Sequence, residues 1–276
     1  MTKAIEIKNV VKVFEGKRGS NLVLDNVSLT IEAGTFLTIV GASGCGKSTL
    51  LRIVAGLETA DDGIVLIGGK PITGPGVDRA MVFQDYSLFP WLTVKQNVLF
   101  SRRLVANSYD NLALERGAEE ARASRLISLV GLAASQDLYP SQLSGGMRQR
   151  IAIARALMSK PSIILMDEPF GALDAQTREV MQDLVLDVVE QEGTTIMFVT
   201  HDVEEAIYLG KRVVLMSPHP GRIDTIYDVP LPDKRDGEMR VDPQFLKLKR
   251  TVMDRIRETV GLSLDRSASR SVEAGA

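Results

Sequence analysis

Apolar and polar residues alternate with a period of two near the start of the chain. Ile5 and Ile7 follow this pattern, and it returns at Val27, Leu29 and Ile31. Such alternation is typical of strands that bury one face. It predicts an antiparallel β region whose strands cover residues 4–14, 22–24 and 27–31.

A mostly apolar run, Phe36–Val40, breaks this alternation and leads into a glycine-rich turn. A helical stretch follows at Lys47–Ala55, and Gly56 is a typical residue to end it. Farther along, the pattern predicts a middle third that is mostly helical. Its predicted elements are short strands at 63–67 and 80–83 and helices at 93–131 and 147–159.

From residue 162 onward, predicted strands alternate with predicted helices. This alternation indicates parallel strands covered by helices, so the fold class is α/β. Residues 263–276 are mostly small and polar, and we expect them to form a disordered tail. The predicted elements are strand 162–167, helix 175–191, strand 195–200, helix 202–209 and strand 212–216.

Composition and charge narrow the classes of partner. Lysine and arginine number 33 against 35 aspartate and glutamate, a formal charge of -2, so no bulk positive field attracts nucleic acid. The purest apolar runs, such as Ile163–Met166, are far shorter than the roughly 20 residues that cross a bilayer. The single cysteine excludes an internal disulfide, and the first residues lack the apolar stretch of a signal peptide. We therefore expect a cytoplasmic chain, and any membrane part must come from another chain.

The segment 41–48 reads GASGCGKS, and it fits the phosphate-loop pattern G-x-x-x-x-G-K-[ST] between a predicted strand and a predicted helix. Glycines let backbone N–H groups converge on phosphate oxygens, and the helix N-terminus adds its positive end. Lys47 is expected to reach the β- and γ-phosphates of ATP, Ser48 to offer its hydroxyl to Mg²⁺, and Thr49 to serve the α-phosphate side. The alternative is a glycine-rich turn without a ligand. The candidate nucleotide-binding residues are Gly41, Ser43, Gly44, Cys45, Gly46, Lys47, Ser48 and Thr49.

Cys45 lies inside this phosphate loop, near a helix N-terminus. Such a position tends to lower the pKa of a thiol and to favour the thiolate. The alternative interpretation is a small residue that fills space. The sequence therefore predicts an ATP site that is sensitive to alkylation.

Two carboxylates, Asp167 and Glu168, end the apolar run Ile163–Met166. Burying such charges without partners is expensive, so a cation or an activated water is their natural partner. Asp167 is predicted to hold Mg²⁺, and Glu168 to orient and deprotonate the attacking water. Alone, this pair could be a solvated sheet edge, but the preceding phosphate loop favours the catalytic interpretation.

A second anion-binding helix terminus is predicted at 143–150, where the sequence LSGGMRQR places a serine and two glycines at the start of a helix. One nucleotide does not need two such termini in one subunit, unless the second faces a nucleotide held by another copy. With this segment the chain resembles the ABC ATPases. The resemblance implies a head-to-tail homodimer in which Ser144, Gly145 and Gly146 close over the ATP of the other copy.

The same resemblance implies roles for four further residues. Phe14 matches the aromatic residue that stacks on adenine, and Gln84 matches the glutamine that senses Mg²⁺ and the attacking water. Asp174 matches the loop that crosses the dimer interface, and His201 matches the switch histidine. Each also has a plainer interpretation: Phe14 as a core residue, Gln84 and Asp174 as polar loop residues, and His201 as the neighbour of a helix cap.

The fold implied by the resemblance is a phosphate-loop (RecA-like) core with an antiparallel β subdomain and an inserted helical subdomain at about 86–160. The whole ATPase domain would cover residues 1–262. Three aromatic residues, Tyr86, Phe89 and Trp91, fall within 86–91, next to Gln84, which suits an interface better than a solvated loop. In the family this region receives a helix of the membrane subunit, and the alternative here is a local hydrophobic core. Segments 15–22 and 101–118 look longer than is usual for the family.

The sequences FQDYSLFPWLTVKQNV and MSPHPGRIDTIYDVPLP resemble the importer ATPases for nitrate, sulfonates and taurine. This implies transmembrane permease subunits as partners, an indirect partner in a periplasmic or extracellular solute-binding protein, and a place at the cytoplasmic face of the membrane. The main rival is the ATPase of an exporter or of a lipid or lipoprotein extraction system, which uses the same catalytic residues. An ABC ATPase acting on DNA or ribosomes usually has two ATPase halves or a long coiled-coil insertion. A phosphate-loop kinase gives no reason for LSGGMRQR.

Overall fold

The computed structural model describes residues 2–16, 19–106, 116–232 and 234–261. Within these residues, six strands form one large sheet in the order β10-β9-β3-β8-β7-β6. All neighbouring strands in it are parallel except β10, which pairs antiparallel with β9. The strands are β3 (Phe36–Gly41), β6 (Arg79–Val82), β7 (Ile163–Asp167), β8 (Thr195–Val199), β9 (Arg212–Ser217) and β10 (Arg222–Asp228).

A smaller N-terminal sheet pairs four of the described strands in the order β2-β1-β4-β5, all antiparallel. The predicted antiparallel β region is therefore confirmed. Residues 22–24 and 27–31 belong to one strand, however, because register shifts let a single strand curve through them. The strands are β1 (Ile5–Gly16), β2 (Gly19–Ile31), β4 (Asp62–Ile67) and β5 (Lys70–Pro71).

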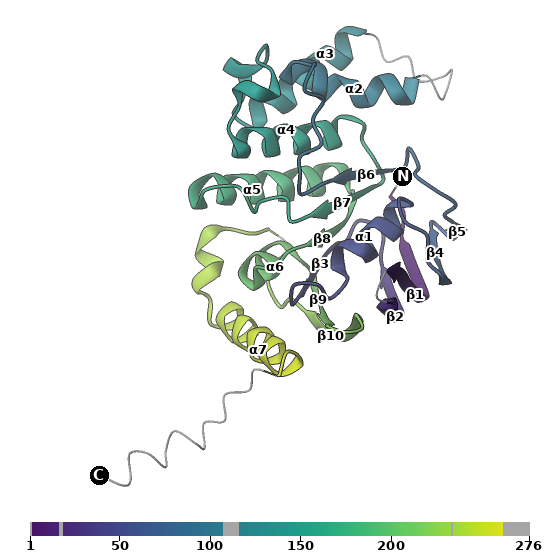
Figure 1. Cartoon of the computed structure of the whole chain (residues 1–276). Helices are drawn as coiled ribbons and strands as arrows, with labels where there is room; N and C mark the ends of the chain where they lie inside the picture. Colours follow the sequence, from purple (N-terminus) through teal and green to yellow (C-terminus); the bar gives the residue numbers. More distant parts are fainter. Residues whose placement is uncertain (1, 17–18, 107–115, 233, 262–276) are drawn as a thin grey trace.

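The helices cover the large sheet on its two faces (Figure 1). Helix α1 (Lys47–Ala55) has the predicted bounds, and its C-cap Gly56 has a left-handed backbone, as the glycine stop signal implies. The predicted helix 93–131 contains two helices, and residues 107–115 between them lie outside the described residues. The other helices are α2 (Val94–Ala106), α3 (Arg116–Leu129), α4 (Gly145–Met158), α5 (Ala175–Glu192), α6 (Val203–Leu209) and α7 (Pro243–Thr259), with short 3₁₀ helices η1 (Ala133–Ser135), η2 (Pro140–Gln142) and η3 (Gly237–Val241).

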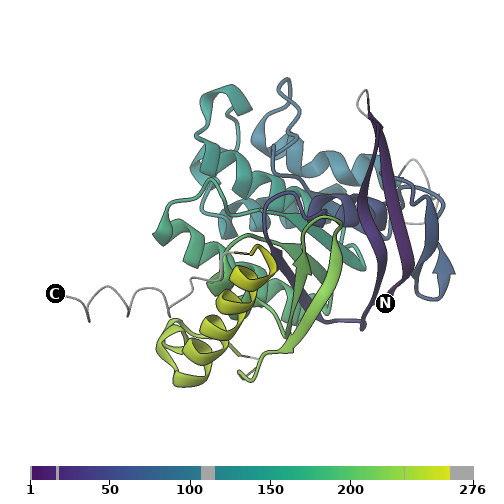
Figure 2. The same ribbon diagram turned by 60° about the horizontal axis from the view of Figure 1, so that its bottom comes forward.

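Strand β3 shows why the strands of the large sheet consist of mostly apolar sequence. Phe36 and Val40 belong to an apolar cluster shared with the helices α2 to α7, whereas Leu37 and Ile39 belong to a second cluster shared with α1 and the N-terminal sheet. A strand buried on both faces carries mostly apolar residues, and its one buried polar side chain here, Thr38, donates a hydrogen bond to the Ala206 carbonyl oxygen. The large sheet is therefore the middle layer of the fold, and Figure 2 shows the purple N-terminal strands on one side of it.

Helices α2, α3 and α4 pack together at the β6 end of the large sheet (Figure 1). They agree with the inserted helical part that the fold class implies. Among the described residues, no helix has both the length and the apolar character needed to cross a membrane. The predicted tail 263–276 lies outside the described residues, as do residues 17–18 of the segment 15–22.

Candidate functional site

The phosphate loop, residues 41–48, joins the carboxyl end of β3 to the start of α1. Gly41 and Gly46 both have positive φ, 155° and 92°. An added Cβ would lie 2.5 Å from the carbonyl oxygen of Met216 at Gly41, and 2.6 Å from Cδ2 of Leu24 at Gly46. The loop thus needs glycine at these positions for both conformation and space.

Lys47 is buried, and its ammonium group lies against its own loop. Nζ donates hydrogen bonds to the carbonyl oxygens of Gly41, at 2.8 Å, and Ala42, at 3.0 Å. The N-cap Gly46 supplies no side-chain cap to the first turn of α1. A buried ammonium beside backbone N–H groups of a helix start is an arrangement that fits a phosphate group. Ser43 is exposed at the loop surface, and Thr49 is half-buried in the first turn of α1.

Cys45 is fully buried in the apolar cluster of α1 and the N-terminal sheet. Burial raises the pKa of its thiol, although the Lys47 ammonium, 3.7 Å from Sγ, opposes this shift. The predicted reactive thiolate is therefore wrong, because the side chain points into the core and desolvation outweighs the nearby positive charge. The space-filling interpretation of Cys45 fits the structure.

Asp167 ends β7 beside the first turn of α1. The Ser48 hydroxyl donates a hydrogen bond to Oδ1 of Asp167 at 2.8 Å. Burial raises the pKa of this carboxyl, and the Ser48 bond acts in the opposite direction. A hydroxyl and a carboxylate oxygen in contact are ligands that Mg²⁺ prefers. No group of three or more His, Cys, Asp or Glu side chains gathers within the described residues, so phosphate and water oxygens would have to complete such a site.

The backbone N–H and the carbonyl oxygen of Glu168 both form hydrogen bonds. It has a positive φ of 47°, its N–H donates to Val199 O at 2.9 Å, and its own carbonyl oxygen accepts from Nε2 of Gln149 at 3.4 Å. Its Oε2 lies 3.1 Å from Nδ1 of His201. A left-handed backbone at a residue other than glycine is strained, and such strain clusters at functional sites.

A cavity of about 50 Å³ lies between Glu168 and His201. Its other lining residues include Arg178, Thr200 and Glu205, for which the sequence pattern predicts no role. This volume is well below the several hundred Å³ typical of small-molecule sites. The cavity between Glu168 and His201 is therefore too small to enclose a nucleotide.

The glycine-rich start of α4 forms the predicted second helix terminus. Ser144 is the N-cap of α4, and its Oγ accepts the Met147 N–H at 3.2 Å. An added Cβ at Gly146 would approach Cδ2 of Leu173 to 3.1 Å. Within the described residues, no hydrogen bond or ion pair joins Ser144 to the phosphate loop.

The other candidates lie on the surface. Phe14 on β1 is 40% exposed, with the Lys12 ammonium 4.9 Å from its ring centre, so it is not a core residue. Gln84 is exposed in the turn after β6, and among the described groups it has no hydrogen-bond partner. Asp174 is exposed and caps α5, where the Thr177 N–H donates to Oδ1 at 2.9 Å and lowers the pKa of this carboxyl.

The turn at Gly221 supports the phosphate loop, a role that the sequence analysis missed. The Gly221 N–H donates to Val23 O, and its carbonyl oxygen accepts the Asp25 N–H. An added Cβ at Gly221 would collide with the carbonyl oxygen of Cys45. The signal in the sequence was only a proline- and glycine-containing turn, and its partner lies about 180 residues earlier.

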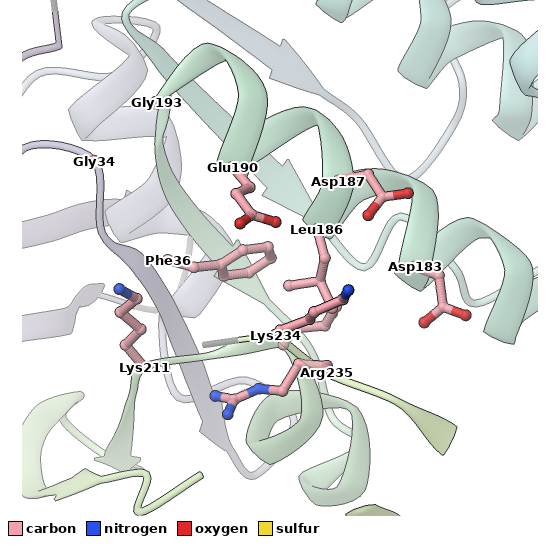
Figure 3. A pocket seen from close by; sticks show the side chains of 11 residues that line it. Gly34, Phe36, Asp183, Leu186, Asp187, Glu190, Gly193, Lys211, Lys234 and Arg235 are labelled. Atoms are coloured by element: carbon pink, nitrogen blue, oxygen red, sulfur yellow. The ribbon is translucent and has the colours of Figure 1, made fainter. Parts of the chain in front are cut away.

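A cavity of about 320 Å³ lies elsewhere. Figure 3 shows the Phe36 ring within it, with Glu190 and Asp187 on the α5 side and Lys234 and Arg235 on the other side. Phe36 begins β3, whereas the phosphate loop follows the end of that strand. This cavity is therefore at the opposite end of the large sheet from the phosphate loop.

A phosphate loop at the end of a parallel strand, with Ser48 bonded to Asp167 and Glu168 beside His201, defines a phosphate-loop ATPase. Residues 24–171 match the family model described as ABC transporter. The chain belongs to this family: it is an ABC ATPase that binds and hydrolyses ATP.

Similar proteins cover almost the whole chain. The nitrate import ATP-binding protein NrtD of Synechocystis is 46% identical over 88% of this chain and 91% of its own length. The aliphatic sulfonates import ATP-binding protein SsuB of Bacillus subtilis is 42% identical over 95% of this chain and 97% of its own length. Among solved structures, the ATP-binding cassette MJ0796, a dimer bound to ADP and Pi in a post-hydrolysis state, matches with a TM-score of 0.74 at 32% identity, over 83% of this chain and all of that one.

We expect Gly221→Ala to weaken ATP binding about tenfold, because the added methyl group must displace the Cys45 carbonyl and with it the phosphate loop. The matched control is Gly237→Ala, where the added Cβ meets no atom within 4 Å. Isothermal titration calorimetry with ATP measures both variants. Equal affinities in the two variants would show that the turn does not support the loop.

Proposed function

We propose that this chain is the ATP-hydrolysing subunit of an ABC importer, whose ATPase domain covers residues 1–262 with a helical subdomain at about 86–160. It would energise uptake of a small anion such as nitrate, a sulfonate or taurine through separate membrane subunits. The observation that carries the ATPase role is the pairing of Ser48 with Asp167 and of Glu168 with His201 beside the phosphate loop. The relatives named for nitrate and sulfonate import support the choice of importer over the ATPase of an exporter or extraction system.

In this proposal the phosphate loop binds the phosphates of ATP. Backbone N–H groups of the loop and the start of α1 contact the phosphate oxygens, and Lys47 moves its ammonium from the loop carbonyls to the β- and γ-phosphates. Ser48, Asp167 and Gln84 would hold Mg²⁺, which when bound neutralises charge that develops on the phosphates. Exposed Phe14 stacks on the adenine ring. Burial disfavours the charged form of the Asp167 carboxyl and raises its pKa, so a bound cation would stabilise the carboxylate.

Glu168 acts as the general base in the proposed reaction. Its carboxylate accepts a proton from the water that attacks the γ-phosphorus, and the leaving group is ADP. His201 holds this carboxylate through the contact of 3.1 Å between Nδ1 and Oε2. Because Glu168 is fixed through its backbone to Val199, the base keeps its position while the phosphates change.

A second copy would complete the site. Ser144, Gly145 and Gly146 at the start of α4 would contact the γ-phosphate held by Lys47 of the other copy, and Asp174 would line the interface. The small cavity at Glu168 and the exposure of Ser144 and Asp174 support this arrangement. A head-to-tail dimer with two-fold symmetry forms two such composite sites.

The aromatic segment 86–91 is the proposed contact with the membrane permease, at the cytoplasmic face of the membrane. Trp91 is 70% exposed, whereas Phe89 packs on Phe100, with ring centres 4.2 Å apart. Arg155 of α4 donates hydrogen bonds to the carbonyl oxygens of Ser87 and Tyr86, so the segment is held against the helix that Ser144 caps. A periplasmic or extracellular solute-binding protein would act indirectly, through the permease.

Glu168→Gln should bind ATP normally but hydrolyse it about a hundredfold more slowly or worse, because the amide cannot take the proton of the attacking water. Lys47→Ala should instead weaken nucleotide binding itself, because it removes the ammonium beside the phosphates. Equilibrium binding and steady-state turnover of both variants separate the two roles. Near-normal turnover in Glu168→Gln would overturn the assignment of the base.

Mixing two inactive variants tests the shared site. A Lys47→Ala chain combined with a Gly145→Asp chain forms heterodimers with one intact and one doubly altered site. We expect the mixture to recover about a quarter of the wild-type rate, because random pairing makes half of the dimers mixed. Differently tagged chains show that heterodimers form. If one intact site is enough for activity, a lack of recovery in dimers shown to be mixed would contradict sharing of the site.

Trp91→Ala should weaken association with the permease by roughly 2 kcal/mol or more, because an exposed aromatic side chain of this size is a typical interface anchor. ATP binding by the isolated subunit should not change, since Trp91 contacts no proposed ligand of ATP or Mg²⁺. Val180→Ala, at another exposed apolar position on α5, is the control. Co-purification with permease in detergent measures the effect. Equal recovery of both variants would locate the contact elsewhere.

A further inference from the structure

The position of the His201 ring depends on its backbone turn. The side chain is 69% exposed, and among the described residues Glu168 is its only hydrogen-bond partner. The turn itself is held more firmly: the Thr200 N–H donates to Ile39 O at 3.1 Å, and the Asp202 N–H donates to Oγ1 of Thr200 at 3.0 Å. The Thr200 side chain therefore holds the peptide that follows His201, through the Asp202 N–H.

The Thr200 side chain lies beside a buried carboxylate, that of Glu205 on α6, and both residues line the small cavity at Glu168 and His201. Glu205 is only 5% exposed and lines the same small cavity as Glu168 and His201. Burial raises the pKa of this carboxyl. A carboxyl group at this depth is costly unless hydrogen bonds satisfy its oxygens, so its partners set where it lies.

The carboxylate of Glu205 accepts a hydrogen bond from the side-chain amide of Gln182 on α5. Gln182 is buried, and its Nε2 donates to Oε1 of Glu205 at 3.0 Å. The oxygen of the same amide accepts from Nη2 of Arg240 at 2.6 Å. Arginine only donates hydrogen bonds, so Arg240 must face the amide oxygen, and this leaves the amide nitrogen to face Glu205.

Arg240 belongs to the 3₁₀ helix η3, which precedes α7. Its guanidinium lies 3.9 Å from the ring centre of Tyr208 on α6, and Nη1 lies 3.7 Å from Oε1 of Glu204. The Tyr208 hydroxyl in turn donates to Oδ1 of Asp183, next to Gln182 on α5. These contacts hold the guanidinium rigidly between α5 and α6.

We infer that Glu205, Gln182 and Arg240 are positioning residues for ATP hydrolysis, which link the C-terminal segment at η3 to the turn that carries His201. The chain of contacts runs from Arg240 through Gln182 and Glu205 to Thr200, and from there to His201 and Glu168. None of the three linking residues needs to touch ATP. The inference rests on the proposed roles of Glu168 and His201.

The test compares two substitutions in the C-terminal segment. Arg240→Ala should lower kcat for ATP hydrolysis about tenfold with an unchanged KM for ATP, because the base loses its alignment while the phosphate loop stays intact. Arg240→Lys, which keeps a donor for Gln182, should recover most of the rate. The control is Lys249→Ala, which breaks the ion pair with Glu204 at 2.5 Å but does not touch Gln182, and it should leave both constants unchanged. If Arg240→Ala behaves like Lys249→Ala, the inference is wrong.

A double-mutant cycle with His201→Ala separates positioning from stability. If Arg240 acts through His201, Arg240→Ala should cause no further loss of kcat in the His201→Ala background. A loss of the same size in both backgrounds, or a parallel loss of ATP affinity, would mean a general structural role and would overturn the inference. Normal hydrolysis by His201→Ala would overturn the proposed role of His201 itself. An impaired His201→Ala beside a fully active Arg240→Ala would overturn this inference alone.

Discussion

The phosphate loop depends on close packing of backbone against backbone. Gly41 and Gly46 have no room for a side chain, and Gly221 presses on the carbonyl of Cys45 from the other side. The loop is thus fixed by β9, by β2 and by the turn before β10, and Lys47 closes it with two hydrogen bonds to its own carbonyls. This packing determines where the start of α1 lies, and so where Ser48 meets Asp167. A binding site built this way is formed by the fold before a ligand arrives.

The strand-end carboxylates sit in two different environments, and this difference suits two roles. Asp167 is buried against Ser48, and burial raises the pKa of its carboxyl. A cation beside this carboxylate would neutralise its charge and so stabilise its ionised form. Glu168 follows it directly but turns away through a left-handed backbone toward the more exposed His201. Adjacent residues of one strand end therefore face separate partners. In this proposal, the left-handed backbone of Glu168 directs the base away from Asp167, the metal ligand.

Signals within a few residues, such as glycine caps and apolar runs, correctly predicted several helices and strands. The bounds of α1 follow from the glycine before it and Gly56 after it, and the apolar runs of β7 and β8 follow from burial on both faces of the sheet. The sequence analysis missed β10 and α7, although Asp242 caps α7 and Pro243 occupies its first turn, both standard start signals. It also placed the Cys45 thiol in the wrong environment. A helix start indicates the direction of a dipole, but whether a side chain on it faces water or the core depends on β1, β2 and β4, which pack there only in three dimensions.

The contacts around η3 show most clearly which residues a search for sequence motifs cannot find. Residues 41–48, 143–150 and 167–168 carry their chemistry within a few positions, so a pattern can find them. Glu205, Gln182 and Arg240 come from three separate elements, and each is an ordinary polar residue when it is read alone. What distinguishes them is burial: two of them are at most 5% exposed, and buried polar groups persist only when each finds its partner. In a fold whose proposed catalytic residues lie at strand ends, such a buried polar link would let a segment remote from the nucleotide fix the geometry of the base. If the proposed link holds, η3 is a support of the catalytic turn rather than an appendage to the ATPase core.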